Sequence, residues 1–337
     1  MGADLTRKHQ RMRESAFVFL RGTFYRWIQT WPDRCPEPDD APRVVGIGDL
    51  HLENFGTWRD RQGRLIWGVN DVDEACRVPY TADLVRLATS AVLAIREGHL
   101  AITAPSACEA ILDGYESSVD CGGKPFIIER RHAWLREAAM ARANDPARSA
   151  HYWEKLTSSA AASGPLPRRK LQRQLPNPKA DCTFVHRVAG VGSLGRQRFV
   201  AIAHEANGQL VAREAKALLP SAAAWARANT HSKNYVEQVL AGAVRVPDPS
   251  FVVSRHWMLR RLSPDCARIE LGDLPAERDE LKLLRAMGWE AANVHLGSKR
   301  RKIAGHLAAQ KRRWLEHAAE EMAAAATDDF RAWVKAT

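Results

Sequence analysis

The chain has 337 residues, of which 45% are hydrophobic and 26% charged, a composition typical of a soluble globular protein. No apolar stretch is long enough to cross a membrane, and the first residues lack the apolar core of a signal peptide, so we expect a cytoplasmic protein without a membrane partner. Six cysteines without paired spacing argue against a disulfide framework and a zinc site. The net charge of +11 is spread along the chain, which disfavours nucleic acid as the partner.

Residues 8–31 are expected to form one helix, because apolar residues recur on one face at helical spacing and several prolines follow. Residues 44–73 come next and contain the candidate catalytic groups. At their centre, the segment GDLHLEN places an Asn five positions after an Asp, the spacing of a kinase catalytic loop.

Phosphoryl transfer requires a carboxylate that orients the attacking hydroxyl and oxygen ligands that hold magnesium. Asp49 is the candidate for the first role, and Asn54 is a candidate metal ligand. His51 lies between them and is a candidate for contacting the transferred group, although a structural loop histidine is the simpler interpretation. A phosphotransferase is therefore the hypothesis to test.

Two short strands are predicted on either side of a turn at residues 60–63, and the second, at residues 65–69, leads into the sequence NDVD. In kinases, a hairpin after the catalytic loop ends in the Asp that binds magnesium. Asp71 is therefore a candidate metal ligand, and Asp73 is a second one. Each residue alone also fits a turn, a cap or a solvated loop, whereas the whole series favours a magnesium site.

Residues 80–98 are apolar nearly all round, which predicts a helix buried within the protein. At this point the series GDLHLENFG, NDVDEA and ADLVRLATS resembles the aminoglycoside-phosphotransferase and protein-kinase superfamily. More narrowly, it is similar to the bacterial family known as domain of unknown function 2252, and this resemblance covers most of the chain. In kinase-like proteins an Asp near the start of the buried helix anchors the catalytic loop. The resemblance implies that role for Asp83; a carboxylate favoured by the helix dipole is an equal alternative.

Further helical segments are predicted between residues 98 and 177, including one near residues 128–141. Residues 158–178 are rich in proline and basic residues and are interpreted as a linker. Three strands should follow, at residues 184–188, 198–203 and 210–214, with an Asn-Gly turn between the second and the third.

A glycine pattern, G-x-G-x-x-G, occupies residues 190–195 and lies between the first two of these strands. Its members Gly190, Gly192, Ser193 and Gly195 are the candidate nucleotide-binding residues. A dinucleotide-binding turn would open a helix, whereas these glycines open a strand, which favours a kinase glycine loop that covers the phosphates.

The third strand of a kinase small lobe brings a Lys to the phosphates, paired with a Glu from the next helix. The resemblance places Arg213 at this Lys position, although Arg and Lys are not interchangeable at a tight site. Lys216 lies three residues later and is expected on the opposite face of the strand. Glu237, in a helix expected at residues 234–240, is the candidate partner of Arg213; a surface carboxylate is an equal alternative.

Two more strands are predicted at residues 251–253 and 256–259, followed by a hinge near residues 260–262 and helices at about 277–296 and 303–325. These elements favour an α+β, bilobal, kinase-like fold with a helical large lobe and a small antiparallel sheet. The catalytic loop precedes the glycine loop, so we infer a circular permutation. The expected segments are 1–178 (large lobe), 179–262 (nucleotide-binding lobe) and 263–337 (helices packing back on the large lobe).

The expected function is an ATP- and magnesium-dependent phosphotransferase that acts on a small molecule. The alternative, motivated by Arg213 and by Ile47 at a position where aminoglycoside kinases have His, is a nucleotide-binding pseudokinase that acts through partners. Nucleotidyl transfer is an enzymatic variant, and nucleic-acid binding by basic helices is a third hypothesis. The acceptor and the oligomeric state stay open.

Overall fold

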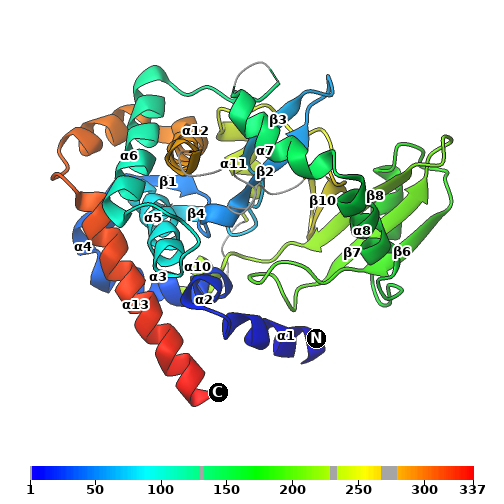
Figure 1. Cartoon of the computed structure of the whole chain (residues 1–337), viewed down its shortest axis with the longest axis horizontal. Coiled ribbons are helices and arrows are strands. Elements are labelled where there is room, and N and C mark those ends of the chain that lie inside the picture. The colour runs from blue at the N-terminus through cyan, green and yellow to red at the C-terminus, as the bar shows by residue number, and fades with distance from the viewer. Residues whose placement is uncertain (1, 130–131, 228–233, 267–278) are drawn as a thin grey trace.

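The structure is a computed structural model that describes residues 2–129, 132–227, 234–266 and 279–337. The protein is a mixed α/β fold in which a five-stranded sheet lies at one end of the molecule and most helices lie at the other (Figure 1). The helices are α1 (Gly2–Met12), α2 (Ala16–Gly22), α3 (Phe24–Arg34), α4 (Pro36–Asp39), α5 (Tyr80–Arg96), α6 (Ala104–Cys121), α7 (Ala133–Ala143), α8 (Pro146–Thr157), α9 (Arg168–Arg173), α10 (Ala222–Ala226), α11 (Val236–Gly242), α12 (Asp279–Ala308) and α13 (Trp314–Ala336). The strands are β1 (Arg43–Gly46), β2 (Phe55–Arg59), β3 (Leu65–Val69), β4 (Cys76–Pro79), β5 (Phe126–Ile127), β6 (Cys182–His186), β7 (Arg198–His204), β8 (Leu210–Ala217), β9 (Val252–Ser254) and β10 (Trp257–Leu262).

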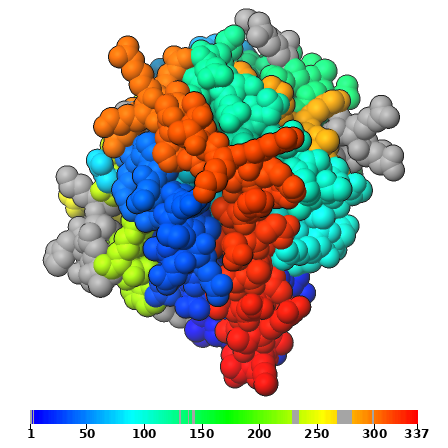
Figure 2. All heavy atoms as spheres, turned by 90° about the vertical axis from the view of Figure 1, so that its left-hand side faces the viewer, coloured from blue at the N-terminus to red at the C-terminus, as the bar shows by residue number. Residues whose placement is uncertain are grey.

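Helix α5 is the centre of the helical part. Every residue from Tyr80 to Ala94 is buried, which confirms the expectation of a helix enclosed on all sides. Helices α6, α12 and α13 pack around it, and α6 and α12 approach so closely that a side chain at Gly114 or Gly288 would strike the backbone of the opposite helix. Figure 2 shows α13 (red) running beside the blue N-terminal helices, where Arg26 of α3 forms an ion pair with Asp329 at 2.8 Å.

The five-stranded sheet is antiparallel in the order β6-β7-β8-β10-β9. All five strands coincide, within a few residues, with strands expected from alternating apolar residues. Helix α9 covers one face of the sheet, where Leu171 packs with Phe199 and Leu259. Helix α8 covers the other face, where Leu156 packs with Val185 and Val200.

Two smaller sheets lie between the helices and the five-stranded sheet. Strands β2 and β3 form the predicted hairpin, with β5 added at its edge, and β1 pairs with β4. The β2–β3 turn is held by Asp60, whose carboxylate accepts hydrogen bonds from the backbone N–H groups of Gln62 and Arg64, both at 2.9 Å. These strands deliver the segments that contain Asp49, Asn54 and Asp71.

Several expected boundaries were wrong. The single helix expected at residues 8–31 is three helices, because Ser15 caps the start of α2 and Gly22 packs tightly against Met12 and Val191 before α3 begins. The segment at 128–141 starts later, as α7, after the short strand β5. The expected linker at 158–178 includes α9, whose Leu171 is buried against the sheet.

The C-terminal helices also differ from the prediction. The backbone at Lys299 leaves helical geometry, yet α12 continues to Ala308, and α13 begins only at Trp314. The expected start at residues 277–278 lies outside the described residues. All six cysteines are free. Among the described helices, none combines the length and the apolar character needed to span a bilayer.

Candidate active site

The segment that carries Asp49 follows β1 and is fixed by a buried carboxylate from α5. Asp83 accepts hydrogen bonds from the backbone N–H groups of Ile47 at 2.6 Å and Gly48 at 2.8 Å. His295 of α12 lies 2.9 Å from the same carboxylate. Gly48 has a φ of +82°, and a side chain there would collide with the backbone of Glu74. Asp83 therefore anchors this backbone turn, the role that the family resemblance implied.

Asp49 is paired with a buried arginine that the sequence analysis did not select. Arg86, fully buried in α5, donates from Nε to Asp49 Oδ1 at 2.9 Å and donates to the same oxygen from Nη2. The rings of Phe24 and Trp27 lie 5.0 and 5.2 Å from its guanidinium carbon. Burial raises the pKa of Asp49 to about 7, although Arg86 acts in the opposite direction.

Asn54 connects the two acidic segments. Its side-chain nitrogen donates to the backbone oxygen of Asp49 at 2.6 Å and lies 3.4 Å from that of Asp71. His51 is the N-cap of the short 3₁₀ helix Leu52–Asn54, and its Nδ1 accepts a hydrogen bond from the N–H of Glu53 at 3.1 Å. His51 thus has a structural role in the loop while it also lines the cavity described below.

Asp71 and Asp73 follow β3 and converge on one cation. The Nζ of Lys216 lies 3.1 Å from Asp71 Oδ1 and 2.7 Å from Asp73 Oδ2. Arg196 also pairs with Asp73, at 2.7 Å, and with Glu74. Two converging carboxylates beside an amide suit magnesium, which is commonly held by one or two carboxylates together with substrate phosphates. Among the described residues, no three His, Cys, Asp or Glu side chains form a cluster able to hold a metal by themselves.

The glycine segment, residues 190–195, is a turn between β6 and β7 and lies over these residues. A side-chain carbon at Gly192 would lie 3.5 Å from Asp49 Oδ2 and 3.0 Å from the backbone oxygen of Arg21. Gly190 and Gly195 have φ values of +76° and +91°, and Ser193 Oγ donates to the backbone oxygen of Ala189 at 3.2 Å. The segment does not open a helix. A side chain at Gly192 would crowd the backbone oxygen of Arg21, whereas its contact with Asp49 would be an ordinary one.

The first cavity, about 190 Å³, lies beneath the glycine segment. It brings together Asp49, His51, Asn54, Asp71 and Asp73 with Gly190, Gly192 and Ser193. Gly195 belongs to the same turn but is absent from the described lining residues. Motifs that are distant in the sequence therefore meet at one cavity.

The expected position of Arg213 was wrong. Arg213 points to the opposite face of β8, where its Nε donates to the backbone oxygen of Gln174 at 2.7 Å. Lys216 faces the first cavity instead, because β8 continues to Ala217 and residues three apart on a strand lie on opposite faces. Glu237 is exposed on α11, and the described lining of the cavity includes neither Glu237 nor Arg213. The expected pair of Arg213 with Glu237 is therefore not part of this site.

Further charged residues at the cavity were missed by the sequence analysis. Lys8 of α1, Arg21 of α2, Glu74 and Arg196 line it. Burial lowers the pKa of Lys8, and the nearby Arg196 lowers it further. Glu74 could have been found, since it completes the NDVDE motif, whereas Lys8 and Arg21 reach the site only through packing of the N-terminal helices.

The fold and this cavity define a mixed α/β protein with a glycine-covered site of paired carboxylates and cations. The chain belongs to the bacterial family described as "Uncharacterized protein conserved in bacteria (DUF2252)", whose model matches residues 2–155 and 166–336. Neither the curated proteins nor the solved structures gave a match to the chain.

Proposed function

We propose that the protein is an ATP- and magnesium-dependent phosphotransferase with a kinase-like site, whose acceptor is a small molecule. One observation carries the proposal. Gly192, at the centre of a kinase-like glycine pattern, lies against the carboxylate of Asp49, the residue that a kinase-like D-x-x-x-x-N spacing selects. Phosphoryl transfer needs these two features in one place, because the phosphates must be held beside the group that orients the acceptor.

The roles follow from the chemistry of each side chain. Asp49 would orient the acceptor hydroxyl and accept its proton, and Lys216 with the backbone N–H groups of the glycine segment would hold the phosphates. Asn54, Asp71 and Asp73 would hold magnesium, which when bound neutralises phosphate charge. Lys216 takes the part that the family resemblance had implied for Arg213.

We also infer that the chain is a circular permutation of a kinase-like bilobal fold, since the Asp49 segment precedes the glycine segment. In support, the terminal helices lie together: the rings of His9 in α1 and Trp333 in α13 are 5.6 Å apart. Termini that lie close together permit such a rearrangement.

The test is Asp71→Asn, assayed for transfer of labelled γ-phosphate from ATP to a panel of hydroxyl-bearing small molecules. We expect a loss of at least about 100-fold in turnover, the typical effect of removing one preorganised charged group, with an unchanged unfolding midpoint. Asp113→Asn is the matched control, because Asp113 is about half exposed and pairs with Arg285 far from the cavity. Undiminished turnover in Asp71→Asn would remove Asp71 from the mechanism.

A second candidate is a nucleotide-binding pseudokinase, and it is favoured by the pairing of Asp49 with Arg86 and of both aspartates with Lys216. Groups already paired within the protein are less available for catalysis. Thermal stabilisation by ATP and magnesium, with no consumption of ATP for any acceptor, would support it. Appearance of labelled α-phosphate on a target would instead indicate nucleotidyl transfer.

A further inference from the structure

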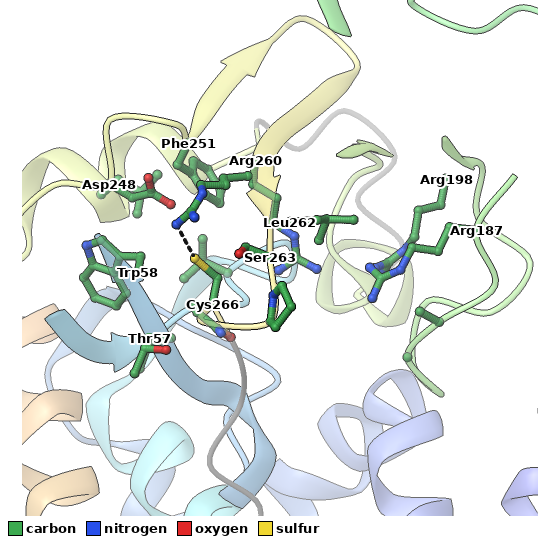
Figure 3. A pocket seen from close by; sticks show the side chains of 18 of the residues that line it. Thr57, Trp58, Arg187, Arg198, Asp248, Phe251, Arg260, Leu262, Ser263 and Cys266 are labelled. Atoms are coloured by element: carbon green, nitrogen blue, oxygen red, sulfur yellow. Dashed lines mark hydrogen bonds between the residues drawn. The ribbon is translucent and has the colours of Figure 1, made fainter. Parts of the chain in front are cut away.

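A second cavity, of about 350 Å³, lies between the five-stranded sheet and the β2–β3 hairpin and shares Gly190 with the first. Figure 3 shows Arg187 and Arg198 reaching into it from one side, with Asp248 and Trp58 on the other. The charged residues among its described lining are five arginines and one aspartate: Arg187, Arg198, Arg245, Arg260, Arg261 and Asp248. Asp248 is the one carboxylate among the described lining residues, so it offsets only part of this positive excess.

Three of these arginines share one carboxylate. Glu214 of β8 is fully buried and accepts hydrogen bonds from Arg187 Nη1 at 2.5 Å, Arg198 Nη1 at 3.1 Å and Arg260 Nε at 2.7 Å. Although burial acts to raise it, the three guanidinium groups hold the pKa of Glu214 well below its usual range. One negative charge therefore faces three positive charges, and each guanidinium has five N–H donors.

The other two arginines have their own partners. Arg261 pairs with Asp265 at 3.1 Å and also donates to the sulfur of Cys266, the bond drawn in Figure 3. Arg245 lies 4.5 Å from the ring of Trp58 and donates to the backbone oxygen of Val69 at 3.2 Å. The surplus of about two positive charges is thus concentrated around Glu214. Buried charges without a counter-charge are costly, so this arrangement favours an anionic ligand.

The chemistry of the cavity narrows the class of anion. Guanidinium forks bind phosphate oxygens with two parallel hydrogen bonds, and a phosphate monoester carries the charge that the surplus requires. The cavity is larger than a single phosphate group needs, and Trp58, Phe251 and Leu262 add apolar surface for an organic part. We propose that the second cavity binds the phosphate group of a small phosphate ester. The site does not depend on magnesium or on the proposed transfer reaction.

Two kinds of ligand carry such a phosphate group. One is the nucleotide, through its own phosphate chain, and the other is a separate phosphorylated molecule. Arg198 connects the cavity to the glycine segment, because its Nη2 donates to Ser193 Oγ at 2.6 Å. Either ligand would therefore meet a residue that touches the glycine segment.

The experiment is calorimetric titration of the intact protein with inorganic pyrophosphate in the absence of magnesium. The test variant is Arg187→Met, because Arg187 is partly exposed, unlike Arg198, and Glu214 keeps two other partners. We expect its Kd for pyrophosphate to rise at least tenfold, with partial recovery in Arg187→Lys, which restores charge but not the fork. Arg285→Met, at a distant exposed ion pair, should bind pyrophosphate as the unmodified protein does.

An unchanged Kd in Arg187→Met with an unchanged unfolding midpoint would overturn the proposal, as would an equal rise of the Kd in Arg285→Met. Titration of ATP into pyrophosphate-saturated protein shows whether the second cavity binds the phosphates of the nucleotide or a separate phosphate ester. Competition that disappears in Arg187→Met indicates the nucleotide's own phosphates, and simultaneous binding indicates a separate ester. Absence of labelled phosphate on every acceptor tested would refute the transfer reaction and leave this phosphate site intact.

Discussion

The two cavities that meet at Gly190 differ in the balance of charge among their lining residues. The described lining of the first contains four carboxylates and four cationic side chains, which are Asp49, Asp71, Asp73 and Glu74 with Lys8, Arg21, Arg196 and Lys216. The second contains five arginines and only Asp248. The first cavity is balanced by ion pairs within the protein, whereas the second has an unbalanced positive charge that a ligand can neutralise.

This difference predicts how each cavity responds when one charge is removed. In the first, Asp49 depends on one fully buried partner, Arg86, so deleting Arg86 leaves an uncompensated charge, whereas Lys216 keeps Asp73 when Asp71 is replaced. In the second, the arginines around Glu214 repel one another, so deleting one relieves repulsion and leaves the carboxylate satisfied. Loss of a charged side chain should therefore mainly lower the free energy of unfolding at the first cavity. At the second cavity it should mainly weaken ligand binding.

The largest expected effect is on stability. Arg86→Met removes the fully buried partner of Asp49 and should lower the free energy of unfolding by about 3–5 kcal/mol. Arg187→Met in the second cavity should change it by less than about 1 kcal/mol, because Arg198 and Arg260 still bind Glu214. Urea unfolding measures both. Arg26→Met is the surface control, because the Arg26 side chain is 46% exposed and pairs with Asp329. Equal losses in Arg86→Met and Arg187→Met would contradict the comparison.

Glu290, which lies behind the second cavity, should change the free energy of unfolding by about 3 kcal/mol as pH rises. Burial raises the pKa of Glu290 to about 7, despite the opposing effect of Arg245. The unfolded chain loses this proton near pH 4.5 and the folded protein only near 7, so the carboxyl group lowers stability progressively as pH rises between these values. Glu290→Gln should reduce that decline by about 3 kcal/mol, measured by urea unfolding from pH 4 to 8, while Asp49, whose pKa burial also raises to about 7, contributes a decline of its own that this variant keeps. Glu320→Gln, an exposed change, should retain the full decline; an equally steep decline in Glu290→Gln would assign the effect to another group.

Local sequence patterns were sufficient for the five-stranded sheet, the β2–β3 hairpin and half of the site, whereas β1, β4 and β5 were not expected. Asp49, Asn54, Asp71 and the glycine segment were found because the turn geometry and the chemistry of each motif depend on a few adjacent residues. The burial of α5 was evident from its apolar composition. The break in the first helix was missed although the Ser15 cap is a local signal, since its side chain accepts from the N–H of Val18. The tight packing of Gly22 against Val191 depends on a distant segment and could not be found from the local pattern.

The counter-charges were missed because ion pairs form between segments that are distant in the sequence. Arg86 lies in a mostly apolar helix, and a buried cation there was a signal for a buried partner. The choice between Arg213 and Lys216 depended on how far β8 extends, and strand ends are poorly defined by alternation.

The two cations of β8 provide the next test. Lys216→Met should reduce nucleotide turnover about 100-fold, because its ammonium group lies at Asp71 and Asp73 in the first cavity. Arg213→Met should change turnover only a few-fold, since Arg213 faces the α9 side of the sheet. Turnover of labelled ATP is measured for both. A larger loss of turnover in Arg213→Met than in Lys216→Met would support Arg213, and not Lys216, as the residue that contacts the phosphates.

The smallest expected effect concerns the boundary between the cavities. In Gly192→Ala the new side-chain carbon would lie 3.0 Å from the backbone oxygen of Arg21 and 3.5 Å from Asp49 Oδ2, so the glycine segment must shift away from the first cavity. Such crowding costs about 1 kcal/mol, which corresponds to a roughly fivefold rise in the Kd for nucleotide.

Gly305→Ala is the matched control, because no atom lies within 4 Å of the added carbon and Gly305 lies in α12, away from both cavities. Pyrophosphate binding at the second cavity should be unaffected by either change. Equal weakening of nucleotide and pyrophosphate in Gly192→Ala would mean that the two cavities act as one site.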